Sequence, residues 1–201
     1  VGRKYKSSLR KGMMRAVGTI FDADADRFFM LEYDPFKDLL WVLSGDETAI
    51  LQAKHLSTRF PEKYKGSLYI NTVESDLNAA NAAEKMGLKA ELTAVGDKWI
   101  LLKILLKQLE QKAKGCDCPK QKRLVFQRET KKLNKTGITS IVSLKKLAKI
   151  LGEKTAQKKD ANPVLAVGSE ETGHNITESK FTRPNGEVES IYSGNGIKSA
   201  L

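Results

Sequence analysis

The sequence predicts an α/β fold with a mixed, mostly parallel sheet covered by helices. Apolar runs at residues 67–73 and 89–95 are each followed by a helical pattern, at 76–86 and 97–114. Such strand-helix alternation is typical of parallel sheets. At 201 residues the chain is long enough to bury a good core. No apolar run reaches the length that a membrane-spanning helix needs.

The first part of the chain predicts a small antiparallel unit. Residues 7–15 are basic and suggest a helix that leads into a buried apolar strand at 17–21. Two further strands, 28–33 and 39–43, are joined by a short loop, so we expect them to pair antiparallel. Ser44 then caps a helix that runs to about Arg59.

The last part of the chain predicts a basic segment followed by a return to the sheet. Within residues 115–162 we expect a short strand at 124–126 and an amphipathic helix at 143–157. A strand at 164–167 and a loop at 168–174 come next. The sequence then predicts a hairpin over 176–192, turning around Pro184-Asn185-Gly186, and the start of a helix at 193–196.

The net charge of +11 comes from one segment of the chain. Residues 107–160 hold sixteen Lys or Arg and five Asp or Glu, whereas the rest of the chain holds nineteen of each. The nucleic-acid interpretation therefore rests on this segment alone. Cys116 and Cys118 are too close together to staple the fold or to give a zinc signature. Without a disulfide framework or a signal peptide, we expect a cytoplasmic protein.

Three aspartates, Asp22, Asp24 and Asp26, fall at alternate positions directly after the strand at 17–21. A strand would point all three side chains to one face, and a tight loop would fold them around one point. Close carboxylates repel each other strongly at low dielectric, so the cluster calls for a cation. Oxygen ligands suit Mg²⁺ or Ca²⁺, and Mg²⁺ leaves room for a substrate phosphate. Arg27 follows at once and can hold a phosphate in bidentate fashion.

A second polar stretch, the loop at 168–174, reads Gly-Ser-Glu-Glu-Thr-Gly-His. Its carboxylates accept hydrogen bonds, Thr172 offers a hydroxyl, and His174 can titrate near neutral pH. The two glycines allow a tight loop or the close approach of a ligand. This chemistry suits a vicinal diol such as a sugar, and the alternative is a polar surface loop.

Two families resemble the stretch at 16–27. An apolar strand before Asp-x-Asp resembles the haloacid-dehalogenase-like phosphatases, in which Asp22 would be a nucleophile and Asp24 an acid. Residues 22–27 also resemble the Asp-Gly-Asp-x-Asp-Arg metal loop of the α-D-phosphohexomutase superfamily, the phosphoglucomutases and phosphomannomutases, with Ala23 in place of the glycine.

Further stretches match the phosphohexomutases in that family's order. Residues 93–98 resemble its Thr-x-Val-Gly-Asp-Arg/Lys loop, and the loop at 168–174 resembles its sugar loop, Gly-Glu-x-Ser-Gly-His. The matches at 43–46 and 193–196 are weaker. The haloacid interpretation does not explain this ordered set, so the phosphohexomutase resemblance is favoured.

The resemblance covers residues 16–103 and 164–201. It implies that residues 1–60 are the C-terminal part of a metal-loop domain, the family's second domain. It also implies that residues 61–201 form a sugar-binding domain, like the family's third, with a basic insertion near 107–162.

The resemblance also implies an activity. Phosphohexomutases transfer a phosphoryl group between the 1- and 6-hydroxyls of a hexose phosphate, such as glucose or mannose phosphate, with the help of Mg²⁺. The implied residues are Asp22, Asp24 and Asp26 for the metal, Glu170 and Thr172 for sugar hydroxyls, His174 as a general acid or base, and Arg27 and Lys98 for phosphate.

Two family motifs are absent from the sequence: the phosphoserine loop, Ser-His-Asn-Pro, and the phosphate clamp, Arg-x-Ser-Gly-Thr. We therefore expect a fragment that is inactive alone and that associates with the missing domains or with itself. The alternative from a different class is a non-catalytic, basic nucleic-acid-binding module. Phe126 is the single aromatic residue in the basic segment, which leaves little for base stacking and disfavours that alternative.

Overall fold

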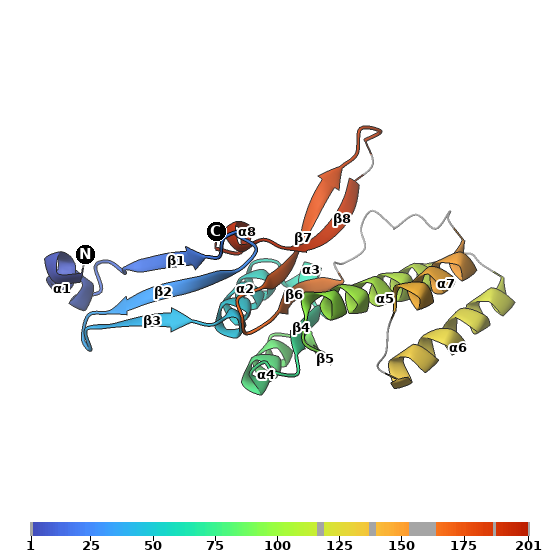
Figure 1. The fold of residues 1–201 in the computed structure, drawn as a ribbon, viewed down its shortest axis with the longest axis horizontal. Coiled ribbons are helices and arrows are strands. Elements are labelled where there is room, and N and C mark those ends of the chain that lie inside the picture. Colours follow the sequence, from blue (N-terminus) through green and yellow to red (C-terminus); the bar gives the residue numbers. More distant parts are fainter. Residues whose placement is uncertain (1, 116–118, 137–139, 153–163, 187, 201) are drawn as a thin grey trace.

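A computed structural model describes residues 2–115, 119–136, 140–152, 164–186 and 188–200 (Figure 1). These residues form a three-stranded sheet, a five-stranded sheet and the helices around them. The prediction of an α/β protein with a mixed sheet is confirmed. Among the described helices, none is both long enough and apolar enough to cross a membrane.

The three-stranded sheet is an antiparallel meander of β1 (Val17–Phe21), β2 (Phe28–Asp34) and β3 (Leu39–Leu43). The expected burial of the first strand is wrong: four of its five residues are exposed. The reason is that β1 lies at the edge of a sheet of only three strands. The preceding helix, α1 (Gly2–Arg10), ends earlier than expected because Gly12 adopts φ +68°, which breaks a helix.

The five-stranded sheet has the strand order β5-β4-β6-β7-β8. Its strands are β4 (Leu68–Thr72), β5 (Lys89–Thr93), β6 (Leu165–Ser169), β7 (Asn175–Thr182) and β8 (Val188–Gly194). β4 pairs in parallel with both β5 and β6, as the strand-helix alternation predicted. β7 and β8 form the expected antiparallel hairpin, and β7 also runs antiparallel to β6.

Helices cover both faces of this sheet, so its central strands are buried on both sides. On one face, α2 (Gly45–Arg59), α3 (Pro61–Tyr64) and α4 (Leu77–Lys85) pack on Tyr69 and Val167. On the other face, α5 (Asp97–Gly115) packs Ile100 and Ile104 on Ile70 and Leu165. The short α8 (Gly196–Ala200) follows β8 and contacts β2.

The basic segment folds as two further helices, α6 (Lys120–Thr136) and α7 (Ile141–Leu151). The strand expected at 124–126 is therefore wrong. Phe126 lies on α6 and packs with Leu144 and Leu147 of α7, and long polar side chains around it favour a helix. The helix expected at 143–157 begins earlier, at Ile141, and its predicted end is wrong: it stops at Leu151, because Gly152 adopts φ +85° and caps it.

Two further sequence predictions are not decided by this architecture. Cys116 and Cys118 lie outside the described residues. The division between residues 1–60 and 61–201 stays a prediction. Helix α2 belongs to the first of these ranges in sequence, and its buried Ala49 and Ala53 pack in the core of the five-stranded sheet.

Candidate metal and sugar-binding site

The three aspartates form one cluster in the loop between β1 and β2. One oxygen from each of Asp22, Asp24 and Asp26 lies within 4.8 Å of the others. Ala25 turns the loop, since its φ is +58° and its amide donates to the carbonyl of Asp22 over 3.2 Å. The Ala25 carbonyl accepts a 2.9 Å bond from the amide of Gly196, which ties the loop to α8.

Arg27 borders this cluster from the start of β2. Its backbone amide donates to Asp22 Oδ1 over 3.1 Å, and its Nε lies 3.7 Å from Asp22 Oδ2 and 4.0 Å from Asp26 Oδ1. The Arg27 side chain is nearly half exposed, at 45%, so its guanidinium is open to an anion from outside.

The electrostatics of the cluster fit a cation. Burial, the bond shared with Asp22 and the charges of Asp22 and Asp24 raise the pKa of Asp26, against the influence of His174. Burial also raises the pKa of Asp22, but bonds from the Arg27 amide and Asp26 and the charge of Arg27 outweigh it, so this pKa is lowered. Asp26 thus holds a proton more firmly because it is partly buried and its carboxylate neighbours are charged.

Unsatisfied oxygen atoms in the aspartate cluster are available to a metal ion. Asp26 Oδ1 is buried, and no group in the described part of the chain donates a hydrogen bond to it. Asp24 is exposed and forms no ion pair with another described residue. Three clustered carboxylates with free oxygen lone pairs are the hard ligands that Mg²⁺ takes. The residues therefore fit this ion.

The loop at 168–174 lies directly against the aspartate loop. The backbones of Arg27 and His174 form an antiparallel bridge, and the Phe28 amide donates to the Gly173 carbonyl over 3.1 Å. The Gly45 amide, at the start of α2, donates to the Glu171 carbonyl over 2.9 Å. These backbone bonds hold the 168–174 loop between β2 and α2.

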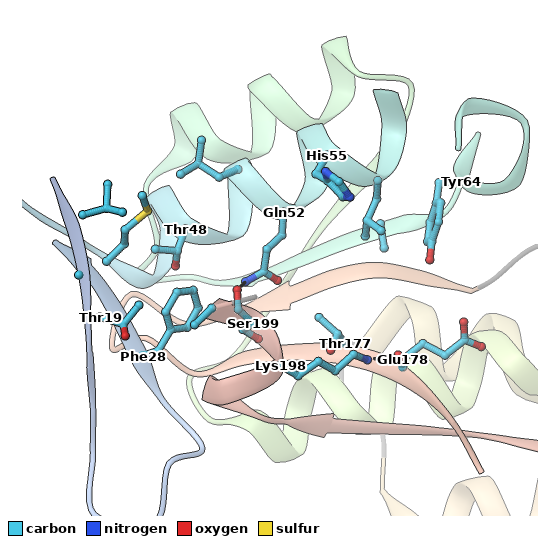
Figure 2. A pocket seen from close by; sticks show the side chains of 17 residues that line it. Thr19, Phe28, Thr48, Gln52, His55, Tyr64, Thr177, Glu178, Lys198 and Ser199 are labelled. Carbon is cyan, nitrogen blue, oxygen red and sulfur yellow. Dashed lines mark hydrogen bonds between the residues drawn. The ribbon is translucent and has the colours of Figure 1, made fainter. Parts of the chain in front are cut away.

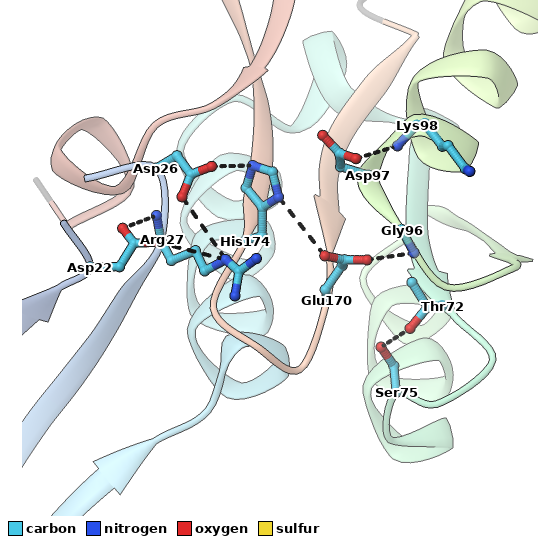
Figure 3. Close-up of polar contacts among 10 residues, drawn as sticks. All are labelled: Asp22, Asp26, Arg27, Thr72, Ser75, Gly96, Asp97, Lys98, Glu170 and His174. Atoms are coloured by element: carbon cyan, nitrogen blue, oxygen red, sulfur yellow. Dashed lines mark hydrogen bonds and ion pairs between the residues drawn. The ribbon is translucent and has the colours of Figure 1, made fainter. Parts of the chain in front are cut away.

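A chain of polar contacts crosses from the aspartates to the second sheet (Figure 3). Asp26 Oδ2 lies 3.6 Å from His174 Nε2, and His174 Nδ1 lies 3.8 Å from Glu170 Oε2. The other carboxylate oxygen of Glu170 accepts a 2.7 Å bond from the amide of Gly96. His174 and Glu170 are both buried, so these contacts are shielded from water.

Comparisons with known proteins point to the phosphohexomutases. The family "Phosphoglucomutase/phosphomannomutase, alpha/beta/alpha domain III" matches residues 44–111. The phosphoglucosamine mutase of Desulforamulus reducens is 33% identical over 89 residues, which are 44% of this chain and 18% of that protein. The phosphoglucosamine mutase of Lactiplantibacillus plantarum is 31% identical over 108 residues, 52% of this chain and 22% of that protein.

These matches support the resemblance of this chain to the α-D-phosphohexomutase superfamily. The chain spans about a fifth of the length of these curated relatives. A solved phosphoglucomutase/phosphomannomutase family protein from Burkholderia thailandensis aligns with all of this chain and 28% of its own, at 15% identity and a TM-score of 0.45.

Two predicted site residues stand apart from the polar contacts. Thr172 is exposed in the turn of the 168–174 loop. Lys98 is exposed, its Nζ lies 5.2 Å from the centre of the Trp99 ring, and its side chain points away from Glu170 (Figure 3). The loop that carries Lys98 nevertheless reaches the site through Gly96.

Sequence reasoning assigned no role to several glycines that the site requires. A Cβ on Gly194 would lie 1.8 Å from His174 Nε2, and one on Gly45 would lie 2.0 Å from the Glu170 carbonyl oxygen. On Gly196 it would lie 2.5 Å from the Arg27 carbonyl oxygen. The weaker family matches at 43–46 and 193–196 were the signal for these positions.

Asp46 is a further residue whose role becomes clear only from the fold. Its buried carboxylate accepts a 2.8 Å bond from the amide of Asp76 and a 3.3 Å bond from the hydroxyl of Ser169. Ser169 immediately precedes Glu170. Asp46 therefore holds together the starts of α2 and α4 and the beginning of the 168–174 loop.

A separate cavity of about 630 Å³ lies between the meander, α2 and β7 (Figure 2). Apolar side chains such as Met30, Leu51 and Leu56 line much of it, with Gln52 and Lys198 among the polar ones. The described residues that line it include none of the aspartate cluster, His174 or Glu170. The candidate site and this cavity are distinct features.

Proposed function

We propose that this chain supplies the metal loop and the sugar loop of a phosphohexomutase, an isomerase that moves a phosphoryl group within a hexose phosphate. The observation that carries the proposal is the contact of Asp26 with His174 and of His174 with Glu170. It joins a cation-binding cluster to a loop with sugar-binding chemistry. The family match at residues 44–111, which lie between the two loops in the sequence, supports a phosphohexomutase-type domain.

Each residue has a role that its surroundings support. Asp22, Asp24 and Asp26 would hold Mg²⁺, which neutralises negative charge on a transferring phosphoryl group. The half-exposed Arg27 would bind phosphate beside the cluster. His174, held between two carboxylates, would take or give a proton at the reacting hydroxyl.

The sugar would lie against the 168–174 loop. One oxygen of Glu170 is bonded to Gly96, and the other is 3.8 Å from His174, where a sugar hydroxyl could donate to it. Thr172 and Lys98 are exposed and would reach a ligand from outside. Because two matched relatives are named phosphoglucosamine mutase, glucosamine phosphate joins glucose and mannose phosphate as a candidate substrate.

Calorimetric titration with Mg²⁺ tests the metal assignment. Asp24→Asn removes one charged ligand at an exposed residue and should weaken Mg²⁺ binding by about tenfold or more. Glu84→Gln removes the same charge from an exposed position on α4 and should leave binding unchanged. Equal binding by the wild type and Asp24→Asn would overturn the metal site.

Proton-nitrogen NMR tests the sugar assignment separately. Titration with glucosamine 1-phosphate, glucose 1-phosphate or mannose 1-phosphate should shift the amide signals of Gly96 and His174. Inorganic phosphate alone should shift Arg27 but leave Gly96 in place, because Gly96 senses the loop through Glu170. Shifts confined to the basic helices α6 and α7 would contradict the assignment.

The haloacid-dehalogenase-like alternative has less support. Its nucleophile would be Asp22, yet both oxygens of Asp22 face Arg27, at 3.1 Å from the amide and 3.7 Å from Nε. Its strand would open a ligand site at the end of a parallel sheet, whereas β1 is the edge of an antiparallel meander. Release of phosphate from a generic aryl phosphate would revive this alternative.

A further inference from the structure

Helix α6 carries a stripe of cations that the proposed mutase chemistry does not use. At 100° per residue the members of the stripe fall within about 80° of one another around the helix. All are exposed: Lys120, Arg128, Lys131 and Lys135. The opposite side of the helix buries Phe126 and Thr130, which fixes the orientation of the stripe toward solvent.

The charge of this stripe is not compensated within the fold. Glu129, the acidic residue of α6, pairs with Lys132 at 3.0 Å and with Lys146 of α7 at 3.2 Å. In the described part of the chain, none of the four stripe cations has an ion-pair partner. The exposed Lys145 and Lys149 of α7 add to the positive potential nearby. A row of unpaired cations attracts a polyanion.

The stripe is also far from the candidate site. Figure 1 shows α6 and α7 at the end of the molecule opposite the meander of β1, β2 and β3. The aspartate cluster lies between β1 and β2. A ligand on the stripe would therefore leave the site open, and the inference stands whether or not the proposed function is correct.

We propose that this stripe binds the phosphate backbone of double-stranded DNA. From Lys120 to Lys135 a helix rises about 22 Å, which passes several phosphates. A helix about 10–12 Å wide enters the major groove of B-form DNA, whereas the major groove of A-form RNA is too narrow.

The aromatic residues decide between double and single strands. Phe126 is the one aromatic side chain of residues 107–160, and it is buried at 2% exposure. The described residues of α6 and α7 therefore offer no exposed ring for base stacking, on which single-strand binding depends. The scarcity of aromatics argued against nucleic acid in the sequence, but backbone contacts to a duplex need cations and no rings.

Fluorescence anisotropy of a labelled DNA duplex of about 20 base pairs tests the proposal with the full chain. Four phosphate contacts predict a slope of log affinity against log salt of about −3.6. Affinity should then fall about 100-fold between about 50 and 200 mM salt.

A pair of charge-matched variants separates the stripe from overall charge. The triple variant Arg128→Gln, Lys131→Gln and Lys135→Gln keeps good helix formers and should weaken binding by about tenfold or more, with the slope reduced by about 3. The control, Lys54→Gln, Arg59→Gln and Lys85→Gln, removes the same charge from exposed positions on α2 and α4. It should bind DNA nearly as the wild type does. Circular dichroism confirms that both variants fold.

Several results would overturn the proposal. Equal loss in the two triple variants would mean that net charge, not the stripe, holds the DNA. Binding of an RNA duplex as tight as that of DNA would refute the choice of DNA. Binding to vesicles of acidic phospholipid without binding to DNA would assign the face to a membrane surface, with the exposed Leu124 and Val125 as its apolar contacts.

Discussion

Ala25 holds the aspartate loop in a conformation that suits glycine better. Its φ of +58° is in the left-handed region, which costs a residue with a Cβ about 1–2 kcal/mol. The family motif has its glycine two positions earlier, where this chain has Ala23. Ala23 does not adopt a positive φ. The strained position of this loop is therefore not the one that the motif marks.

Exchange of these two alanines for glycine should have opposite effects. Ala25→Gly removes the left-handed strain and should raise the free energy of unfolding by about 0.5–1 kcal/mol, after the added entropy of the unfolded chain. Ala23→Gly gains nothing in the fold and should lower it by about 0.5–1 kcal/mol. Urea unfolding measures both. A higher free energy of unfolding for Ala23→Gly would contradict this and show that the strain lies at residue 23.

At this scale, the sequence predicted the residues that lie next to each other in the chain. Asp22, Asp24, Asp26 and Arg27 form one loop, so their spacing alone brings them together. The contact of His174 with Asp26 joins residues far apart in sequence, and the ordered family motifs were needed to suggest it. The need for glycine at Gly194 arises from the packing of His174 and leaves no local pattern.

At the scale of elements, the core strands and helices were predictable because the hydrophobic periodicity and the capping residues indicate the same elements. Helix α2 has the full capping box of Ser44 and Glu47, and β4 alternates side chains between two cores. The interpretation of residues 124–126 as a strand failed because three apolar residues fit either structure. The tertiary contacts of Phe126 with α7 decide for a helix.

An ion-pair network ties helix α5 to strand β5. Glu91 lies 2.7 Å from Lys103 Nζ and 3.2 Å from Lys107 Nζ, and its side chain is 25% exposed. Burial raises the pKa of Glu91, but the two lysines outweigh it, so the pKa is lowered. A carboxylate with a lowered pKa stabilises the fold above its unfolded pKa of about 4.3 and loses that effect as pH falls through the folded value.

Glu91→Gln should therefore destabilise the protein in a pH-dependent way. We expect a loss of about 1 kcal/mol near pH 7, which shrinks toward zero below about pH 4 as the wild-type carboxylate is protonated. Urea unfolding across this range gives the difference. Glu84→Gln on the exposed face of α4 is the control and should show a small, flat difference. A pH-independent loss in Glu91→Gln would mean that packing, not charge, is responsible.

At the scale of the whole molecule, the excess positive charge and the candidate site lie at opposite ends. The meander and the 168–174 loop hold the acidic site, while α6 and α7 hold the excess of cations. Composition alone predicted this separation, because residues 107–160 carry the whole net charge. It could not predict that the cations would line one face of a helix, since that depends on which side of α6 packs on its neighbours.

The last prediction concerns turnover by the chain as a whole. Phosphoryl transfer requires a donor in line with the acceptor, and charge neutralisation at the aspartates does not supply one. The sequence holds no Ser-His-Asn-Pro loop to act as that donor. We therefore expect the chain alone to bind Mg²⁺ and sugar phosphate without converting glucose, mannose or glucosamine 1-phosphate to the 6-phosphate.

A coupled assay with Mg²⁺ and the bisphosphorylated sugar as activator measures this turnover. A rate above about 1 s⁻¹, within the usual range of enzymes, would show that one of the chain's own hydroxyls serves as donor. Addition of the phosphoserine domain of a related mutase provides the positive arm. A rate that appears only in that mixture, and that falls in Asp24→Asn but not in Glu84→Gln, would show that this chain contributes the metal loop to a shared site.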